Sequence, residues 1–332
     1  MNLWEQFISK ENFALALKRA VCGKKNKRAI ASFLENAAEN LEDLRQMVAR
    51  GEFKTSPYRT MEITDPKRRT IYILPFCPDR IVHHALMNVI APIWESQFIR
   101  DSYACITERG LHTASRRCMD FCRRNEYVLK CDIRKFYPSI NHDIMFEVVK
   151  KSVHDQQLLE IFHDIIYSLP GGKNLPIGNL CSQWMGNLYL HEMDLFIKNK
   201  LGVRDYLRYA DDFCLFSNDK AQLREWRGAL NEFLATKLQL GFSKSEIMRV
   251  ADGVDFVGYR HFKDFILLRK RTLKNLKKRI KNIWECVGAN ENSPNFRGQI
   301  ASAQGWLKFA CSYNLRKKFR FEQLKKKVGI FN

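Results

Sequence analysis

The sequence predicts an α+β fold, in which helices pack with strands that pair in the antiparallel sense. Two observations support this class. Apolar residues recur at helical spacing over several long segments, and short β-rich runs bounded by turn residues lie between those segments. A strand–turn–strand unit near the centre, YLRYADDFCLF (206–216), predicts an antiparallel hairpin. The 332 residues, 45% of them hydrophobic, suffice to bury a large core.

In the first half of the chain, helical segments come before and after the first strands. Apolar spacing and turn residues give the boundaries. The predicted elements are, in order, a helical segment over 1–50 that ends at Gly51, two strands joined by TDPKRR within 57–75, an apolar helix over 79–98 interrupted at Pro92, a strand YVLKCDI at 127–133 and a helix HDIMFEVVKKSV at 142–153.

In the second half, a Gly-rich loop leads into the central hairpin and then into basic helices. The predicted elements are, in order, a loop GGKNLPIGN at 171–179, a long helix over 180–201, the hairpin at 206–216, an amphipathic helix over 219–238, short strands within 254–262 and 265–270, and helices broken by GANENSPNF at 288–296.

The charge balance of the chain predicts a polyanionic partner. Lys and Arg total 56 against 36 Asp and Glu, a net charge of +20, which favours nucleic acid or an anionic membrane surface. No stretch approaches the ~18 consecutive apolar residues of a membrane span, and the N-terminus lacks the pattern of a signal peptide. Ten cysteines stand singly, without a CxxC pair, which predicts reduced thiols, no zinc site and a cytoplasmic location. We therefore expect nucleic acid as the partner, and no membrane.

Three aspartates lie where predicted strands end. Asp211 and Asp212 form the turn of the central hairpin, and Asp132 ends the strand at 127–133. If these strands are neighbours in one sheet, the three carboxylates converge and repel one another unless cations lie between them. Oxygen ligands suit Mg²⁺, with Mn²⁺ as the alternative, and two such ions can support nucleotidyl transfer to a 3′-hydroxyl. The competing interpretation is a solvated turn, because Asp is common in turns.

Five segments, CDIRKFYPSI, LPIGNLCSQ, YADD, FSKSE and FVGYR, resemble the ordered motifs of reverse transcriptases. The resemblance runs from DPKRRTIYILP to the final helices. It implies an RNA-directed DNA polymerase with the right-hand arrangement of fingers, palm and thumb. The domains implied are an N-terminal helical segment (1–50), a fingers and palm domain (51–262), and a basic helical thumb with a C-terminal tail (263–332).

The resemblance assigns catalytic roles to matching positions. Asp132, Asp211 and Asp212 would bind the metal ions, assisted by the backbone carbonyl of Ile133. Lys244, in the segment after the palm helix, would protonate the leaving pyrophosphate. These assignments agree with the chemistry that the three carboxylates suggest by themselves.

The resemblance also implies a nucleotide site. Lys67 and Arg69 match a basic fingers hairpin that grips the triphosphate, and a solvated turn is the alternative for this pair. Tyr137 matches an aromatic gate that presses against the sugar 2′ position and rejects ribonucleotides. The alternative is that Phe136 and Tyr137 are core residues, and we expect one of the two to be so.

The loop LPIGNLCSQ departs from the pattern of most reverse transcriptases. Ile177 stands before Gly178 where most have Gln, and Gln183 follows Ser182 where most have Pro. Gly178 still allows a close backbone approach to the nucleotide. A branched alkyl group at 177 removes hydrogen bonds to the incoming nucleotide or the template base. Discrimination between bases should therefore weaken.

This form of the loop resembles the reverse transcriptases of diversity-generating retroelements, which copy a noncoding template RNA into cDNA with frequent errors at adenines. The partners implied are template RNA, the RNA/DNA duplex, deoxynucleoside triphosphates and a small basic accessory protein. The alternatives are a reverse transcriptase of an antiphage-defence system and a catalytically inactive RNA-binding scaffold. Group II intron and retron enzymes fit these segments less well.

Basic residues dominate the C-terminal segments. FVGYR matches a primer-grip hairpin, in which Gly258 and Tyr259 would contact nucleic acid. Residues 269–281 carry eight positive charges and no negative ones, and apolar residues occupy the other face at helical spacing. A solvated amphipathic helix is the alternative to a helix that lies along a template–primer duplex. The expected nucleic-acid contacts of this segment are Arg269, Lys270, Arg271, Lys274, Lys277, Lys278 and Lys281.

Overall fold

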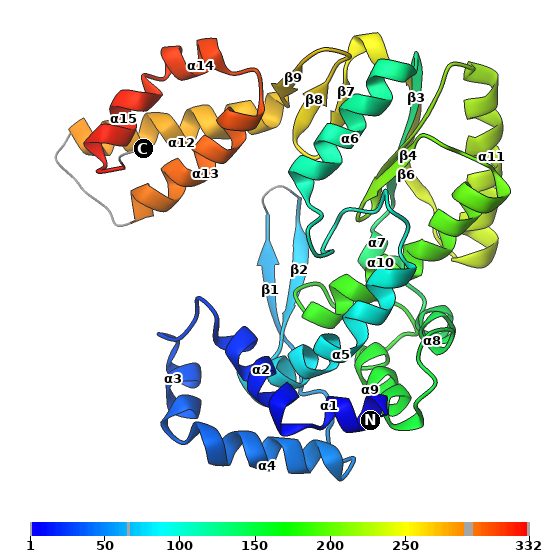
Figure 1. Ribbon diagram of the computed structural model, residues 1–332, viewed down its shortest axis with the longest axis vertical. Helices are drawn as coiled ribbons and strands as arrows, with labels where there is room; N and C mark the ends of the chain where they lie inside the picture. The colour runs from blue at the N-terminus through cyan, green and yellow to red at the C-terminus, as the bar shows by residue number, and fades with distance from the viewer. Residues whose placement is uncertain (1, 65–66, 289–294, 331–332) are drawn as a thin grey trace.

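The computed structural model describes residues 2–64, 67–288 and 295–330. The N-terminal helices gather at one end of the molecule, and the last helices of the chain lie toward the other end (Figure 1). Side chains of Asn2 and Ser9 cap the first two helices by accepting backbone N–H groups of Glu5 and Asn12. The helices at the first end are α1 (Leu3–Phe7), α2 (Lys10–Val21), α3 (Arg28–Glu35), α4 (Ala37–Ala49), α5 (Ile81–Gln97) and α9 (Gln156–Ile166).

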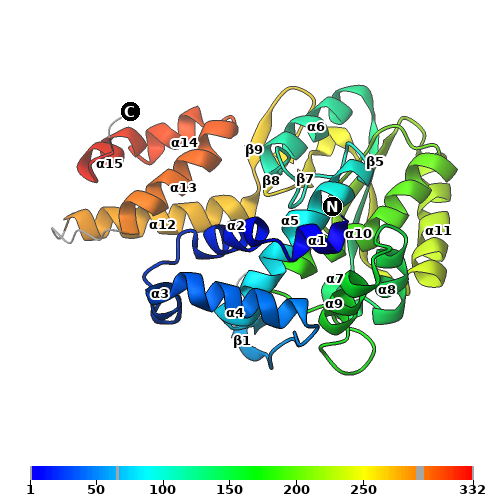
Figure 2. The ribbon, with the colours of Figure 1, turned by 60° about the horizontal axis from the view of Figure 1, so that its bottom comes forward.

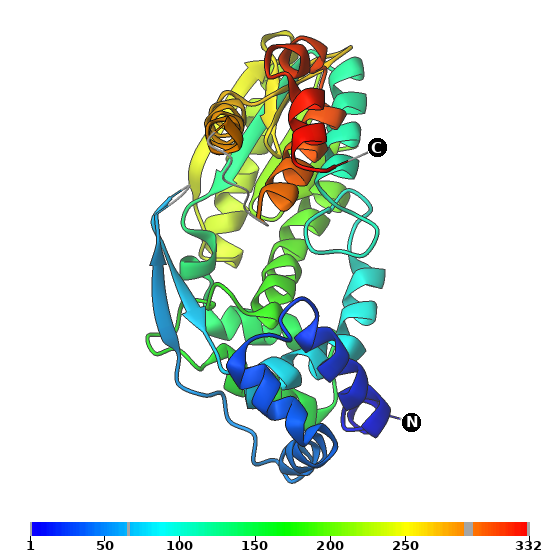
Figure 3. The same cartoon turned by 90° about the vertical axis from the view of Figure 1, so that its left-hand side faces the viewer.

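A two-stranded hairpin extends from these helices toward the centre of the molecule (Figures 1 and 3). It consists of β1 (Arg59–Ile63) and β2 (Arg69–Ile73), antiparallel, with Ile63 opposite Arg69. The backbone N–H of Tyr72 donates to the carbonyl of Ile177 at 2.8 Å. This bond attaches the β1–β2 hairpin to the loop at 171–179.

A four-stranded sheet, the central sheet, carries the predicted aspartates. Its strands β3 (Tyr127–Ile133), β4 (Tyr206–Tyr209), β5 (Asp212–Ser217) and β6 (Phe242–Arg249) lie in the order β4-β5-β3-β6. All neighbours pair antiparallel. The sequence predicted the first three strands but not β6, in which polar and apolar residues do not alternate.

Apolar side chains cover both faces of the central sheet. On one face, Leu129 and Cys131 of β3 belong to a core that includes residues of α10 and α11. On the other face, Val128 packs in a core with Phe121 of α6 and Phe256 of β7. Because side chains alternate along a strand, Lys130 and Asp132 share this second face.

The other helical elements before β7 are η1 (Phe76–Arg80), α6 (Leu111–Arg124), α7 (Phe136–Ser139), α8 (His142–Lys150), α10 (Leu180–Leu195), η2 (Phe196–Lys200), α11 (Lys220–Lys237) and η3 (Val250–Asp252).

The C-terminal helices form a unit to one side of the central sheet (Figure 2). A three-stranded sheet leads into them, and Leu276, Ile280 and Ile283 of the first helix are buried in a separate apolar core, as their helical spacing predicted. The elements are β7 (Val254–Phe256), β8 (Tyr259–His261), β9 (Ile266–Leu268), α12 (Lys270–Gly288), α13 (Asn295–Phe309), α14 (Tyr313–Lys318) and α15 (Phe321–Lys327). The predicted break at 288–296 falls mostly outside the described residues.

The predicted interruption at Pro92 is wrong, because α5 continues through this residue from Ile81 to Gln97. Proline removes one backbone N–H and usually kinks or ends a helix. Ile90 and Trp94, on either side of it, are both fully buried. Burial of these side chains outweighs the lost hydrogen bond.

Candidate active site

Strand register places the aspartates at one end of the central sheet. Asp132 of β3 lies directly opposite Asp212 of β5 and Lys244 of β6. Residues directly opposite in neighbouring strands point to the same face. Asp211 lies in the tight link between β4 and β5, next to Ala210, whose φ is 54°. The sheet thus sets Asp132 and Asp212 side by side, with Asp211 at the adjacent tip.

A buried arginine holds this tip in place. Arg208 of β4 donates from Nη1 to the carbonyl of Ala210 at 3.2 Å and to Oδ1 of Asn187 at 3.1 Å. Its Nε donates to Asp194 Oδ1 at 2.8 Å, and both side chains of this ion pair are 0% exposed. The hydroxyl of Tyr206 donates to the same carboxylate. The motifs in the sequence did not reveal this network, although an Arg inside the apolar run YLRY was a visible signal.

Ser243 contacts the Asp132 carboxylate. The pairing of β3 with β6 shifts register between Asp132, opposite Lys244, and Ile133, opposite Phe242. Ser243 is the extra residue at this bulge, and its hydroxyl donates to Oδ2 of Asp132. A bulge re-aims a side chain in this way. Because the bulge depends on pairing between distant segments, the sequence alone did not reveal Ser243.

A hollow of about 620 Å³ opens in front of Asp132 and Asp211. Residues from the β1–β2 hairpin, the end of β3 and the loop before α10 line it together. It therefore gathers most of the predicted nucleotide-binding positions. Its lining includes Lys67, Arg69, Tyr72, Asp132, Ile133, Tyr137, Asn174, Ile177, Asp211 and Ser243.

The pKa values of two carboxyl groups in and beside this hollow are raised. Burial raises the pKa of Asp211, and the neighbouring Asp132 adds to the effect, while Arg69 and Lys67 oppose it. Burial also raises the pKa of Asp212 to about 6, against the opposing influence of Lys130. Clustered carboxylates of this kind gain most from a bound cation.

Tyr137 and Phe136 take different roles, in agreement with the expectation that one of the two belongs to the core. Both residues line the hollow, but Phe136 is buried in the core at 3% exposure, whereas Tyr137 is only partly buried and packs against that core. A Cβ placed on Gly186 of α10 would lie 3.2 Å from each of the two rings. Gly186, which no motif indicated, therefore lets both rings lie against this helix.

The loop before α10 approaches a strand more closely than its motif suggests. Gly178 has φ of 117°, and a Cβ at this position would lie 2.9 Å from the carbonyl oxygen of Tyr72 in β2. The close approach predicted for Gly178 is therefore to the β1–β2 hairpin. Ile177 lies in the hollow itself, where its side chain offers no hydrogen-bonding group.

Four of the predicted catalytic and nucleotide-binding residues lie outside the lining of the hollow: Asp212, Gly178, Gln183 and Lys244. Lys244 shares the row of Asp132, but its Nζ lies 2.8 Å from Glu246 Oε2. Gln183, in the first turn of α10, accepts a weak hydrogen bond from the Cys105 thiol at 3.5 Å. Both side chains would have to reorient to contact a nucleotide.

The ring of Tyr259, a residue predicted to contact nucleic acid, is directed into an apolar core in this structure, and the contact itself stays a prediction. Tyr259 is fully buried, with its ring 5.0 Å from that of Trp306 and its hydroxyl 3.2 Å from His112 Nε2. Gly258 has φ of 85°, and a Cβ there would lie 2.6 Å from Trp306. Both residues join the β7–β8 hairpin to the C-terminal helices, where the large apolar area of an aromatic ring is removed from water.

The predicted cations of α12 and of the residue before it are exposed. They alternate with the buried Leu276, Ile280 and Ile283, so they lie on the outer face of the helix. Arg269 also lies 3.8 Å from Asp255. The exposed residues are Arg269, Lys270, Arg271, Lys274, Lys277, Lys278 and Lys281.

The donor set at the hollow fits a hard divalent cation. Asp132 and Asp211 supply carboxylate oxygens, and Ile133 lines the same wall. Asp212 instead lies 3.2 Å from the Lys130 ammonium group. Within the described residues no three His, Cys, Asp or Glu side chains form a ready-made metal site. The sheet thus brings the three aspartates to the same end, as expected. Their carboxylates do not, however, form a complete set of metal ligands.

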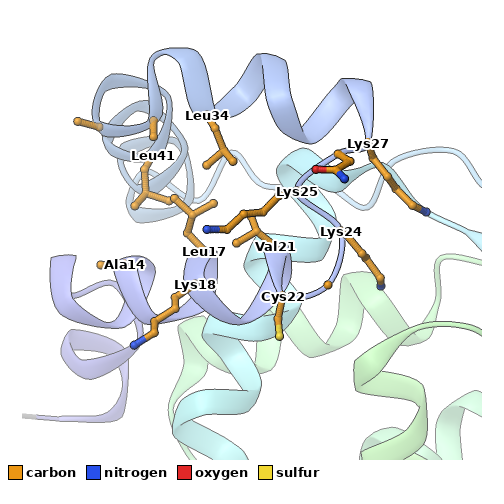
Figure 4. A pocket seen from close by; sticks show the side chains of 14 residues that line it. Ala14, Leu17, Lys18, Val21, Cys22, Lys24, Lys25, Lys27, Leu34 and Leu41 are labelled. Carbon is orange, nitrogen blue, oxygen red and sulfur yellow. The ribbon is translucent and has the colours of Figure 1, made fainter. Parts of the chain in front are cut away.

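A larger hollow, of about 990 Å³, lies among α2, α3 and α4 (Figure 4). Leu17, Val21, Leu34 and Leu41 form its apolar part, and lysines such as Lys25 stand around it. No acidic or histidine side chain is among the described residues that line it. It therefore lacks carboxylates such as those of Asp132 and Asp211, and the smaller hollow remains the candidate site.

The fold is shared with a solved structure of apo telomerase from Candida Tropicalis. The TM-score is 0.53 at 11% sequence identity, and the match covers 86% of this chain and 63% of that chain. This likeness supports the predicted right-hand fold.

The model of the family described as "Reverse transcriptase (RNA-dependent DNA polymerase)" matches residues 64–261. The match spans more than half of the chain, and the chain belongs to this family. The protein is an RNA-directed DNA polymerase, a nucleotidyltransferase, and enzymes of this family use divalent metal ions. The expected α+β right-hand fold and the expected enzyme class are confirmed.

Relatives with known names cover different shares of the chain. Protein YkfC of Escherichia coli is 27% identical over 71% of this chain and 73% of its own length. The retron Ec73 reverse transcriptase of Escherichia coli is 23% identical over 71% and 78%. The group II intron-encoded protein LtrA of Lactococcus lactis subsp. cremoris is 21% identical over 48% of this chain and 28% of its own length. None of the helices in the described part of the chain is long and apolar enough to cross a bilayer.

Proposed function

We propose that this enzyme copies a noncoding template RNA into cDNA by two-metal nucleotidyl transfer. The observation that carries the proposal is the hollow in which Asp132 and Asp211 face Lys67 and Arg69. Two Mg²⁺ ions, when bound, would supply activation of the primer 3′-hydroxyl and stabilisation of the leaving pyrophosphate. Mn²⁺ has the same preference for oxygen ligands and is the alternative ion.

The residues of the chain bind and orient the reactants. Asp132, Asp211 and Asp212 would hold the ions, with the carbonyl of Ile133. Burial raises the pKa of the Asp211 carboxyl group, and the charges of Arg69 and Lys67 oppose that rise, so both cations would contact a triphosphate held there. Their hairpin is fixed to the loop at 171–179 by the bond from Tyr72 to Ile177.

Selection of the nucleotide depends on the walls of the hollow. Tyr137 would exclude the 2′-hydroxyl of a ribonucleotide, because Gly186 allows its ring to lie tightly against α10. Lys244, once released from Glu246, would donate a proton to pyrophosphate. Gly178 and Gln183 would act indirectly. Gly178 would fix the position of the loop, and Gln183 that of α10.

The biological role that we propose is error-prone copying of the diversity-generating retroelement type. It is supported by Ile177, which presents an alkyl group to the hollow where a polar group would discriminate between bases. A small basic accessory protein is the partner expected with this role. A reverse transcriptase that serves antiphage defence has the same chemistry and is the second candidate, and an inactive RNA-binding scaffold is the third.

We further propose a division into an N-terminal helical segment (1–50), fingers and palm (51–262) and a basic thumb with its tail (263–332). The separate apolar core formed by residues such as Leu276 and Phe321 supports the thumb as a unit. All ten cysteines, which lie in the described residues, are free thiols, in keeping with work in the cytoplasm.

The test is primer extension on an RNA template with Mg²⁺ and the four deoxynucleoside triphosphates. We expect cDNA from the wild type and none from Asp211→Ala, while Asp252→Ala, an exposed acid outside the hollow, serves as the matched control. Extension by Asp211→Ala at the wild-type rate would exclude the catalytic assignment, and an inactive wild type would favour the scaffold. Sequencing the cDNA separates the roles, because errors opposite template adenines support diversification and faithful copies support defence.

A further inference from the structure

A lysine that no motif singled out is buried beside the carboxylates. Lys130 lies two residues before Asp132 on the same face of β3, and its side chain is 8% exposed. Its Nζ lies 3.2 Å from Oδ1 and 3.3 Å from Oδ2 of Asp212. An ammonium group this deeply buried is costly unless it is paired and hydrogen-bonded. Lys130 is buried and paired with a carboxylate in this way, which indicates that its position has a function.

The same ammonium group contacts a second part of the chain. It donates a hydrogen bond to the backbone carbonyl of Asp255 in β7, and it lies 5.8 Å from the centre of the Phe256 ring. The carboxylate of Asp255 lies 3.8 Å from Arg269, whose backbone N–H donates to the carbonyl of Gly258 at 3.1 Å. A continuous chain of polar contacts therefore runs from Asp212 to the residue before α12.

The contact with Lys130 distinguishes Asp212 from the other two aspartates. Asp132 and Asp211 line the hollow, whereas Asp212 does not and faces Lys130. One positive charge among three carboxylates lowers their mutual repulsion before any cation binds. It also restrains the orientation of Asp212, since Nζ donates a hydrogen bond to Oδ2 and forms an ion pair with Oδ1 at 3.2 Å.

We propose that Lys130 is a positioning residue of the polymerase reaction, which holds the Asp212 carboxylate and the β7–β8 hairpin in one fixed arrangement. The carboxylates at the end of the central sheet and the hairpin at the base of the C-terminal helices are then set relative to each other before substrate arrives. Lys130 acts through Asp212 and does not touch the reacting atoms. The inference rests on the proposed function, in which Asp212 helps to hold the metal ions.

The first measurement separates kcat from KM in Lys130→Met, which keeps the bulk of the side chain and removes its charge. We expect kcat for primer extension to fall roughly 10- to 100-fold, as for a misplacement of about 1 Å, while KM for the nucleotide changes less than about threefold. Lys198→Met is the matched control, because Lys198 is also partly buried, lies 3.6 Å from Asp101 and donates to a backbone carbonyl. The control should retain wild-type kcat.

The second measurement is Mn²⁺ binding without nucleotide, followed by electron paramagnetic resonance. Removal of a positive charge next to the carboxylates should tighten Mn²⁺ binding roughly tenfold, although catalysis is slower. Damage to the fold would weaken binding and catalysis together. Amide exchange over 254–261 should also become faster in Lys130→Met, because the link from Asp255 to the sheet is lost.

The third measurement is a double-mutant cycle with Asp212→Asn. If Lys130 acts through Asp212, the double variant should be no slower than Asp212→Asn alone, within about twofold. Wild-type kcat in Lys130→Met, or rate losses that multiply in the double variant, would overturn the inference. Failure of the proposed function has a different signature, since the wild type itself would then not extend a primer on RNA.

Discussion

The central sheet and the C-terminal helices both present positive charge beside the site, but they hold it in opposite ways. In the sheet, Lys130 and Arg208 are buried, and each is fixed by a carboxylate and a backbone carbonyl. On α12, the cations from Lys270 to Lys281 are exposed on the outer face of the helix. The buried charges of the sheet fix the positions of individual side chains. The exposed charges of α12 act together, through the positive electrostatic potential that they create.

This difference decides how each region should respond to substitution. A buried charge that loses its partner costs several kcal/mol, because the remaining group stays desolvated. An exposed charge loses little by itself, and its contribution to binding depends on salt. Single changes in the sheet should therefore have large effects, and single changes on α12 should have small, additive ones.

The largest effect is expected from Asp132→Ala. Loss of a carboxylate that holds the ions removes several kcal/mol of transition-state stabilisation, so kcat should fall about 10³-fold or more. Single-turnover primer extension measures this loss. Ser243→Ala, which removes only the hydrogen bond to Asp132, should fall well short of it. Equal losses in the two variants would place the main role of Asp132 in structure.

Arg208→Met should destabilise the fold by about 3–5 kcal/mol, because it leaves Asp194 buried without its partner. Urea unfolding followed by circular dichroism measures the change. The double variant Arg208→Met with Asp194→Leu should recover much of the loss, since no buried charge remains. A loss below about 1 kcal/mol in the single variant would contradict the view that sheet charges are individually fixed.

The β7–β8 hairpin connects the central sheet to the C-terminal helices, and its contribution to the free energy of unfolding should decrease at acid pH. Burial lowers the pKa of His261 to about 4. In the neutral ring, Nδ1 donates a hydrogen bond to the Val254 carbonyl and Nε2 accepts one from the Ser115 hydroxyl. The unfolded chain then binds the proton at higher pH than the folded one, so this contribution is present above pH 6.5 and is lost as pH falls toward 4. The loss should reach about 2 kcal/mol at pH 5. Unfolding free energies of the wild type and of His261→Asn over this range test it, because the variant should lose that part of the slope.

Single substitutions on α12 should weaken binding of a template–primer duplex only slightly. Lys277→Ala should cost less than about threefold in affinity, and each neutralised phosphate contact should reduce the slope of log K against log salt by about 0.9. Combining it with Lys274→Ala and Lys281→Ala should add these effects. Lys220→Ala on α11 is the control. A single variant with a tenfold loss at high salt would show that a particular cation is individually positioned.

The smallest change in rate, but an informative change in product, is expected from Ile177→Gln. An amide at the hollow can restore a hydrogen bond worth about 1 kcal/mol, so errors should fall roughly fivefold with kcat nearly unchanged. Ile177→Val, which keeps an alkyl group, is the matched control. An error spectrum identical to the wild type would remove Ile177 as the cause of low fidelity.

The sequence predicted those features that depend on local pattern. Alternation and turns located β3, β4 and β5. The motif around Asp211 indicated the chemistry only together with Asp132 and with the other segments that resemble reverse transcriptase motifs. Ser243, Arg208 and Lys130 escaped, because each acquires its role from a partner far along the chain or from a bulge in strand pairing. The burial of the Tyr259 ring was not predicted for a related reason, since it depends on how the C-terminal helices pack.

The hydrogen bond from Tyr72 to Ile177 joins main chain to main chain, so it does not depend on which side chain stands at 177. A lineage could exchange that side chain repeatedly and keep the hairpin attached to the loop throughout. Accuracy of copying can then drift under selection while the architecture that performs the copying is inherited unchanged. If Ile177 sets the error rate, as we propose, that rate can be altered without disturbing the attachment of the hairpin.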